Sequence, residues 1–439
     1  MTFAPLRGFR DYLPPDAGAR SAIRSRMREA ARRAGFVELE TPSVESLELY
    51  RVKSGESIGE ELWTFVDKGD RPVALAAETT PSLARVFVDR AKSEPMPVKW
   101  FTVSKLWRYE EPQLGRTREF FQFNLDLLGV AGIEAEVELL STAALILDAS
   151  GAEGLYEFRV NDRELAEGLG RRRGATDLPG YFRAIDRARK LPRPEIVGQL
   201  EASGLSKEAA ERTVDELATG RSPRSASQAR EALARIDPDG LPAPSVAALE
   251  RLTRLFELAG PAGIADRIAY DPGTVRGLAY YTSTIFEAFA RSGEGRSIFG
   301  GGRYDRLVEL FGGPPTPAVG LAIGDQTLEN LLKSHGRWPS GEPGLDTYVI
   351  AVTPAEAPVA LEIARHLRAQ GTSADLDLLG RSLSRQLREA ARRNARRAIL
   401  VGPQELARGM VVERDLTTGE QRERPRSSFD GRAAPPGPA

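Results

Sequence analysis

The sequence contains no cysteine and only two histidines, His335 and His366. The lack of cysteine excludes disulfide bonds, thiolate metal sites and cysteine nucleophiles. Two histidines in separate segments offer almost nothing from which to build a histidine-ligated metal site or a serine-histidine catalytic triad. We therefore predict no metal-binding residues, and we expect any catalysis to rest on other residue types.

Long hydrophobic runs and an excess of charge of one sign are also missing. The N-terminal segment MTFAPLRGFRDYLPPD has no apolar core of signal-peptide length, and no run approaches the roughly 18 apolar residues of a membrane span. We therefore expect a cytoplasmic protein with no membrane partner. Because 61 basic residues nearly balance 62 acidic ones, any contact with nucleic acid must come from a local patch rather than from the net charge.

The 439 residues suggest two or three domains. Residues 19–34 have the apolar spacing of an amphipathic helix, whereas 99–110 and 118–128 alternate like the strands of an antiparallel hairpin. Near the C-terminus, alternating strand and helix patterns predict a small α/β domain with a mainly parallel sheet. The predicted organisation is a first domain at 1–333 with a helical insertion at about 155–260, a linker at 334–346, the α/β domain at 347–421 and a disordered tail at 422–439.

The predicted hairpin carries polar side chains beside its turn. Strand alternation places Arg108 and Glu110 on one face. On the returning strand, four polar residues share a face: Arg118, Gln122, Asn124 and Asp126. Guanidinium groups suit phosphate oxygens, while carboxylates and amides suit amines and nucleobases. This surface therefore fits either a nucleotide beside an amino acid or a solvated polar face, which antiparallel sheets commonly have.

Two further arginine patterns are open to more than one interpretation. In VRGLAYYTSTIFE, Arg276 precedes a Tyr-Tyr pair, and an arginine on a strand is usually ion-paired or at the rim. In SRQLREAARRNARRA, a basic stripe follows helical spacing: Arg385, Arg388, Arg392 and Arg396. Such a stripe is either a solvated face or a surface that binds nucleic-acid phosphates without reading the sequence.

Several segments together resemble the histidyl-tRNA synthetase family of the class II aminoacyl-tRNA synthetases. WRYEEPQLGRTREFFQFNLDLLG looks like motif 2, VRGLAYYTSTIFE like the histidine-binding signature, and GGGRYDRLVELFGG like its continuation. RGFRDYLPP resembles the N-terminal pattern, and GFVELETPSVE resembles motif 1. DLLGRSLSRQLREAARRNARRAILVG resembles the anticodon-binding domain, so that the resemblance covers residues 7–421 in the family's order.

The resemblance implies an α+β fold, with a class II antiparallel sheet flanked by helices, a helical insertion and a C-terminal α/β anticodon-binding domain. It also implies that the domain at 1–333 is catalytic. The family normally forms a homodimer, so we expect one here. The implied reaction activates L-histidine with ATP and Mg2+ to histidyl-adenylate and then transfers the histidyl group to tRNA(His). The substrate's own carboxylate is the nucleophile, so the scarcity of histidine in the chain is no objection.

The resemblance also assigns roles to single residues. Arg276 and Arg108 would be catalytic, placed at the α-phosphate of ATP. The ATP-binding residues would be Arg108, Glu110, Arg116 and Arg118. The histidine-binding residues would be Glu78, Thr80, Gln122, Asp126, Tyr280, Tyr281 and Tyr304. The tRNA-binding residues would be Arg385, Arg388, Arg392 and Arg396. Mg2+ would enter with ATP, without a dedicated protein site.

The chain departs from the family pattern at several positions. Asp126 is one methylene shorter than the usual glutamate, and Ala279 replaces a frequent aspartate. Ala76 and Ala77 stand where the family commonly has Arg-Pro. Motif 3 usually ends in Gly-Leu-Glu-Arg, with the arginine at adenine and the γ-phosphate, but here Gly324 is followed by Asp-Gln-Thr.

Two alternatives to an active histidine ligase follow from these departures. One is a non-catalytic, histidine-sensing paralogue resembling the regulatory subunit of ATP phosphoribosyltransferase, which the altered motif 3 favours. Arg108, Arg276 and the apparent anticodon-binding domain argue against it. The other is a ligase for a different amino acid or for a protein, against which the pocket tyrosines and Gln122 argue.

Overall fold

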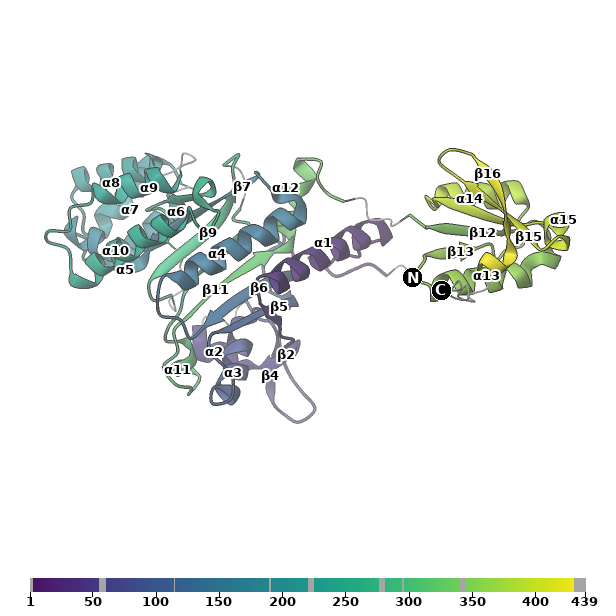
Figure 1. Cartoon of the computed structure of the whole chain (residues 1–439). Helices are drawn as coiled ribbons and strands as arrows, with labels where there is room; N and C mark the ends of the chain where they lie inside the picture. The colour runs from purple at the N-terminus through teal and green to yellow at the C-terminus, as the bar shows by residue number, and fades with distance from the viewer. Residues whose placement is uncertain are drawn as a thin grey trace, which may run out of the picture. The chain divides into compact units, whose positions relative to one another are not determined.

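The computed structural model describes residues 3–54, 61–113, 115–188, 191–219, 225–275, 281–293, 296–339 and 344–429. The chain divides into two compact units, one built mainly from residues 19–339 and the other mainly from residues 340–439 (Figure 1). Each unit has its own sheet and its own hydrophobic core. In the part of the chain that the structure describes, no helix is both long enough and apolar enough to cross a membrane.

The first unit is built on an eight-stranded sheet. In order across the sheet, its strands are β1 (Val37–Glu38), β5 (Val98–Trp107), β6 (Glu119–Leu128), β11 (Ala318–Gly324), β10 (Phe299–Arg303), β9 (Thr284–Ala290), β7 (Tyr156–Asp162) and β8 (Ile268–Tyr270). The strands from β5 to β7 in this order pair antiparallel, whereas β1 and β8 pair in parallel at the two edges. The antiparallel sheet expected from the sequence is confirmed.

The predicted hairpin is the longest strand pair in this sheet. β5 and β6 pair from Val98 with Leu128 to Trp107 with Glu119. Phe123, Leu125 and Leu127 are buried in the main core on one face, as their alternation predicts. Their neighbours of opposite parity therefore lie on the other face of the sheet.

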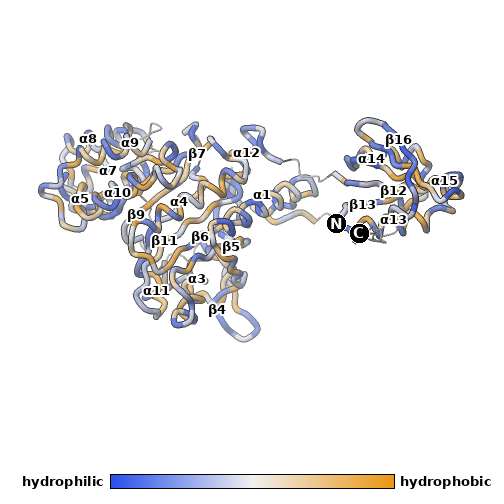
Figure 2. The backbone as a smooth tube through the Cα atoms, in the orientation of Figure 1, coloured by the Kyte–Doolittle hydropathy of each residue, from blue (hydrophilic) through white to orange (hydrophobic). Residues whose placement is uncertain are grey.

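Helices cover the core face of the sheet. The core includes apolar side chains of α1 (Pro14–Arg33), α4 (Glu134–Leu147), α9 (Ala226–Ala234), α10 (Ala243–Leu258) and α12 (Asp325–Ser334). The helix predicted at 19–34 is confirmed, although it begins earlier, at Pro14, where a proline is tolerated in the first turn. Gly35 follows its end with φ of 79°, a conformation that favours glycine. Figure 2 shows hydrophobic segments along the strands and the helices packed on them.

The opposite face of the sheet carries a second hydrophobic cluster. α3 (Thr80–Arg90) and α11 (Leu307–Leu310) pack there with Tyr281, Ile285 and Tyr304. Beside them lie α2 (Leu47–Ser54) and a three-stranded sheet in the order β2 (Val44–Ser46), β4 (Pro72–Leu75) and β3 (Thr64–Val66). The segment FVELETPSVE thus forms two short strands, β1 and β2, on either side of Pro42.

The helical insertion begins later than expected from the sequence. Residues 156–162 form β7 in the central sheet, so the helices start with α5. The insertion contains α5 (Arg163–Arg172), α6 (Leu178–Arg187), α7 (Arg193–Ala202) and α8 (Lys207–Thr219), followed by α9 and α10. Its own core lies mainly between α6, α7 and α8. Short helical turns complete the unit at Asp148–Ala152 and Ala265–Arg267.

The second unit has a five-stranded sheet in the order β13 (Ala374–Leu376), β12 (Thr347–Ala351), β14 (Arg397–Val401), β15 (Met410–Asp415) and β16 (Gln421–Pro425). Its helices are α13 (Ala357–Ala369), α14 (Leu383–Arg392) and α15 (Pro403–Ala407), with short turns at Pro354–Glu356 and Arg426–Phe429. Only β13, β12 and β14 are parallel, because β15 and β16 return as antiparallel neighbours. The expectation of a mainly parallel sheet is therefore only half right.

The C-terminal boundary also differs from the prediction. Residues 422–425 were expected to begin a disordered tail, but they belong to β16 and pair with β15. Phe429 is buried in the core of this unit. A charged edge strand needs few apolar residues, and for that reason its composition resembles that of a tail. Residues 430–439 lie outside the described part of the chain.

Candidate active site

The centre of the large sheet carries small residues on the face opposite the core. Gln122, Asn124 and Asp126 of β6 lie opposite Gly324, Ala322 and Gly320 of β11. Ala322 in turn lies opposite Gly300 of β10. Because side chains alternate along a strand, these residues share one face, and glycine and alanine leave space above it. The polar side chains of β6 border that space.

An acidic cavity of about 110 Å³ occupies one part of this face. Its lining residues are Glu78, Thr80, Arg108, Gln122, Asn124, Asp126, Tyr281, Gly300, Tyr304, Gly320, Leu321 and Ala322. Six of the seven residues predicted to bind histidine therefore meet at one cavity, although they come from four separate segments of the chain. Tyr280, the seventh, lies outside the described residues, as does Arg276.

Asp126 and Tyr304 form the buried wall of the acidic cavity. The Tyr304 hydroxyl donates a hydrogen bond to Oδ1 of Asp126, and each residue is only 2% exposed. Glu78 is half-buried at the start of α3, next to the buried Thr80. Carboxylates and a phenol at a nearly dry site suit a ligand that carries amine or imidazole N–H groups.

An arginine cavity of about 200 Å³ lies beside the acidic one. Its charged lining residues are Arg108, Glu110, Arg116, Arg296 and Asp325. Phe120, Ser297, Gln326 and Thr327 also line it, among others. The two cavities share Arg108, Gln122, Gly300 and Ala322, so they are contiguous. Three guanidinium groups in one polar cavity favour an anionic ligand, and the ring of Phe120 offers a surface on which a base can stack.

The arginines of this site differ in how they are held. Arg108 donates from Nε to the carbonyl of Ala77 at 3.1 Å, and Arg116 pairs with Glu110 at 2.5 Å. Burial lowers the pKa of Arg296, and repulsion from Arg116 adds to this effect. Arg296 was not singled out by the sequence, because it precedes the glycine-rich strand in a segment without a clear pattern.

Arg118 is not where the strand pattern predicts it. β6 begins at Glu119, so Arg118 precedes the alternating part of the strand. Its Nε donates to the carbonyl of Glu110 at 3.0 Å, and its guanidinium lies 4.2 Å from the centre of the Tyr109 ring. It is absent from the described lining of both cavities. The structure thus shows local contacts for Arg118, and its predicted contact with ATP stays a prediction.

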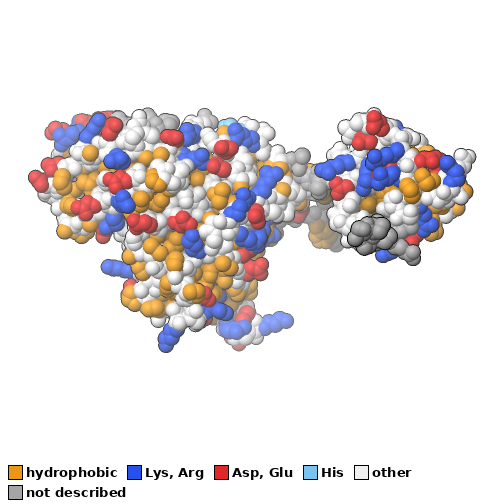
Figure 3. All heavy atoms as spheres, viewed as in Figure 1, with side chains coloured by type: hydrophobic (Ala, Val, Ile, Leu, Met, Phe, Trp, Pro, Cys, Tyr) orange, Lys and Arg blue, Asp and Glu red, His pale blue; other side chains and the backbone are white. Residues whose placement is uncertain are grey.

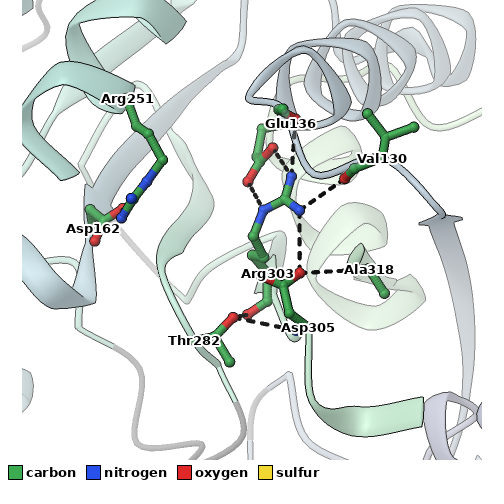
Figure 4. Close-up of polar contacts among 9 residues, drawn as sticks. Val130, Glu136, Asp162, Arg251, Thr282, Arg303, Asp305 and Ala318 are labelled. Carbon is green, nitrogen blue, oxygen red and sulfur yellow. Dashed lines mark hydrogen bonds and ion pairs between the residues drawn. The ribbon is translucent and has the colours of Figure 1, made fainter. Parts of the chain in front are cut away.

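A buried ion pair holds the end of β10, directly before Tyr304. Arg303 donates from Nε and Nη2 to the Glu136 carboxylate at 2.7 and 2.6 Å, and to the carbonyl of Val130 at 3.0 Å (Figure 4). Next in sequence to Tyr304, Asp305 accepts from the backbone N–H of Ala318 at 3.1 Å. Side chains at the end of β10 and directly after it thus anchor the glycine-rich segment GGGRYD to α4 and to β11. Sequence reasoning missed the part played by Arg303 and Glu136.

The end of β11, where motif 3 departs from the family pattern, is also anchored. Asp325 and Glu329 both pair with Arg20 of α1, which is 5% exposed. Burial raises the pKa of Asp325, and the positive charge of Arg20 opposes that rise. Asp325 therefore faces an internal partner, and its negative charge is compensated.

The predicted basic stripe in the second unit is only partly helical. Arg385, Arg388 and Arg392 lie on α14 and are exposed, but the helix ends at Arg392, so Arg396 lies beyond it. Arg392 pairs with Glu389 at 2.5 Å, and Arg396 with Asp346 at 3.2 Å. Figure 3 shows Lys and Arg side chains gathered on one face of this unit.

Comparison with known proteins places this geometry in a family. A family model described as histidyl-tRNA synthetase matches residues 8–328, and one described as anticodon binding domain matches residues 346–432. A histidine-tRNA ligase of Natronomonas pharaonis is 40% identical over 427 residues, which cover 97% of this chain and 96% of the relative. A histidine-tRNA ligase of Pyrococcus furiosus is 37% identical over 421 residues, 95% of each chain.

The fold agrees with this relationship. The crystal structure of a histidyl-tRNA synthetase from Nostoc matches with a TM-score of 0.84 at 22% sequence identity. The match covers 99% of this chain and 100% of the Nostoc chain. Both units are therefore included in the match.

Proposed function

Because this chain belongs to the histidyl-tRNA synthetase family, we propose that it acts as a histidine-tRNA ligase through the two contiguous cavities. It activates L-histidine with ATP to histidyl-adenylate and then transfers the histidyl group to tRNA(His). The observation that supports this proposal most directly is that the acidic cavity and the arginine cavity meet at Arg108. An amino acid and a nucleotide bound in these cavities would present their reacting groups to the same guanidinium.

The acidic cavity is the histidine site in this proposal. Glu78 and Thr80 hold the amino group, while Asp126, Tyr281 and Tyr304 surround the imidazole, with Gln122 between the two cavities. Tyr280 completes the pocket by family resemblance. The Tyr304 hydroxyl fixes one oxygen of Asp126, so the carboxylate is oriented before the ligand enters.

The arginine cavity is the ATP site. Arg108 and Arg116 bind phosphate oxygens, Glu110 accepts from the adenine amino group, and Phe120 stacks on the base. The histidine carboxylate attacks the α-phosphorus, a new C–O–P linkage forms, and the bond to the β-phosphate breaks to release pyrophosphate. Arg108 and Arg276 stabilise the charge that builds on the α-phosphate, an effect for which one donor is worth on the order of a hundred- to a thousandfold in rate.

In the second step, a hydroxyl of the terminal tRNA ribose attacks the histidyl carbonyl, and AMP leaves. The second unit binds tRNA, with the exposed arginines of α14 at its phosphates. Mg2+ enters with ATP, because the two carboxylates that line the arginine cavity are paired with arginines already, Glu110 with Arg116 and Asp325 with Arg20.

We also propose a cytoplasmic homodimer. Val37 on the edge strand β1 is 65% exposed, and Val66 on the small sheet is equally exposed. Leu310 of α11 is 53% exposed, and Figure 3 shows hydrophobic side chains gathered on the lower part of the first unit, where Figure 1 draws α11 and α3. Exposed apolar residues on an edge strand and on a surface suit burial against a second copy. Sedimentation or light scattering of the purified chain tests this assembly.

The decisive experiment is histidine-dependent exchange between ATP and pyrophosphate, followed by charging of tRNA(His), for the wild type and Arg276→Ala. We expect the variant to keep histidine binding and to lose most of the adenylation rate, because its guanidinium acts on the charge of the transition state. Arg254→Ala, which removes an exposed arginine paired with Glu257, is the control.

The possible results separate the hypotheses. Histidine binding without exchange in the wild type would contradict the ligase assignment and favour the regulatory paralogue. Exchange without tRNA charging would indicate a ligase with another acceptor. An unchanged exchange rate in Arg276→Ala would remove Arg276 from its assigned role. No observation in the structure favours either alternative.

A further inference from the structure

Arg296 occupies the side of the arginine cavity where the end of β11 meets the start of β10. The backbone N–H of Gly324 donates to the carbonyl of Ile298 at 3.2 Å, so the strand pairing extends to the residues just before β10. Arg296 and Ser297 line the cavity there, opposite Gly324, Gln326 and Thr327. Two segments about 30 residues apart in sequence therefore meet around the same part of the cavity.

The β11 side of this part of the cavity supplies no cation. The side chain of Asp325 pairs with Arg20, and the Gln326 amide donates to the Tyr12 hydroxyl at 3.0 Å. Thr327 is uncharged. Among the described lining residues, the positive charge in this part of the cavity therefore comes from Arg296 on the β10 side.

Arg296 has no carboxylate partner within the described residues, unlike its neighbours. Arg116 pairs with Glu110 at 2.5 Å, and Arg303 pairs with Glu136. Arg296 nevertheless lies close enough to Arg116 for their charges to repel, and part of its surface is withdrawn from water. Two guanidinium groups that face one polar cavity, with one carboxylate between them, leave a net positive charge. An anion with several negative charges compensates this arrangement best.

We propose that Arg296 binds the terminal phosphates of ATP together with Arg116, and so holds the pyrophosphate that leaves. This inference rests on the proposed ATP site. Arg108, which is shared with the acidic cavity, lies where the α-phosphate must meet the amino acid. Arg296 lines only the arginine cavity, so it belongs with the part of the triphosphate that is remote from the histidine.

The assignment predicts a specific pattern of affinities. Arg296 contacts the β- and γ-phosphates, so its loss weakens ATP but leaves AMP, which lacks those phosphates, unaffected. Histidine binds in the acidic cavity and is also unaffected. A guanidinium that stacked on the adenine ring would instead weaken ATP and AMP equally.

The experiment compares the wild type, Arg296→Ala, Arg296→Lys and the control Arg254→Ala. Equilibrium dialysis with labelled ATP and AMP gives the affinities, and histidine-dependent exchange gives the KM for ATP and for histidine. We expect Arg296→Ala to weaken ATP by roughly 10- to 100-fold, the loss of one or two charge-assisted hydrogen bonds, with AMP affinity and histidine KM within about twofold. Arg296→Lys should recover part of the loss, because it restores the charge without the fork.

Each outcome bears on the inference separately from the proposed function. An unchanged ATP affinity in Arg296→Ala, or equal losses for ATP and AMP, would overturn the phosphate contact. The dialysis needs no catalysis, so a wild type that binds ATP without exchange would overturn the ligase assignment while the Arg296 comparison remains valid. Tryptophan fluorescence in urea confirms that each variant is folded, because all four tryptophans lie in the first unit.

Discussion

The substitution Gly320→Ala tests the geometry of the acidic cavity with the smallest possible change. Gly320 lies on the site face of β11, opposite Asp126 of β6. A methyl group at this position would lie 2.2 Å from Oδ1 of Asp126 and 2.9 Å from the hydroxyl of Tyr304. Both distances are shorter than a carbon atom can tolerate. The methyl group would therefore enter the space of the Asp126–Tyr304 hydrogen bond.

The expected loss of histidine affinity depends on which atoms can move away from the new methyl group. The carbonyl of Leu125, 3.0 Å from the new methyl group, belongs to a paired strand, so the Asp126 side chain must rotate instead. Rotation breaks the bond from Tyr304 and turns the carboxylate away from the ligand. A hydrogen bond to a charged group contributes about 1.5–3 kcal/mol. Histidine binding should therefore weaken by roughly 10- to 150-fold, since 1.4 kcal/mol corresponds to tenfold.

Gly324→Ala provides a matched control on the same strand and the same face. Within the described residues, no atom outside its chain neighbours lies within 4 Å of a methyl group built at Gly324, and its backbone, with φ of −83° and ψ of 130°, accepts alanine. The assay is the KM for histidine in ATP–pyrophosphate exchange. We expect a large rise for Gly320→Ala and none for Gly324→Ala. If folded Gly320→Ala protein kept the wild-type histidine KM, the acidic cavity would not be the histidine site.

Two further predictions concern stability and tRNA. Glu136→Ala removes the two short ion-pair contacts of the buried Arg303 and leaves it only the longer pair with Asp305 at 3.3 Å, so it should lower the free energy of unfolding of the first unit by about 3–5 kcal/mol. Urea denaturation followed by tryptophan fluorescence measures this change, and Glu208→Ala, from an exposed pair, should change it by less than about 1 kcal/mol. Combined Arg385→Ala and Arg388→Ala should weaken tRNA binding and reduce the slope of log affinity against log salt by about 2, one for each phosphate contact. Arg408→Ala, whose guanidinium already pairs with Glu423, should leave the slope unchanged. Equal slopes for the double variant and the wild type would contradict the α14 surface.

The sequence predicted the central hairpin and its polar face because strand alternation is a local property. Gln122 and Asp126 lie where that alternation places them. Arg118 does not, because the N-terminal segment reaches it from far away in sequence: its backbone N–H donates to the carbonyl of Gly8 at 2.9 Å. The alternation of residues within the hairpin gives no information about that contact.

Other differences have the same origin in tertiary structure. β16 is built from charged residues, because it is an edge strand whose only demand is pairing with β15. Arg296 carries no local pattern, and its position follows from the pairing of β10 with β11. The motifs of the family thus predicted six residues of the acidic cavity and, in the arginine cavity, Arg108, Glu110 and Arg116. Arg296, in contrast, could be placed in the arginine cavity only from the fold.

The glycine-rich strand β10 illustrates why the site is built on the sheet rather than beside it. Glycine inside a strand weakens it, because it adds no packing and loses more conformational entropy. Here the glycines are required by close approach: a methyl group at Gly302 would lie 2.8 Å from the ring of Tyr281. The cost is offset by strand pairing on both sides of β10, by the buried Phe299 and by the anchor of Arg303 on Glu136. The glycine face of β10 therefore leaves the space in which Tyr281 reaches the acidic cavity. On the opposite face, Phe299 and Arg303 supply the packing and the ion pair that stabilise the strand.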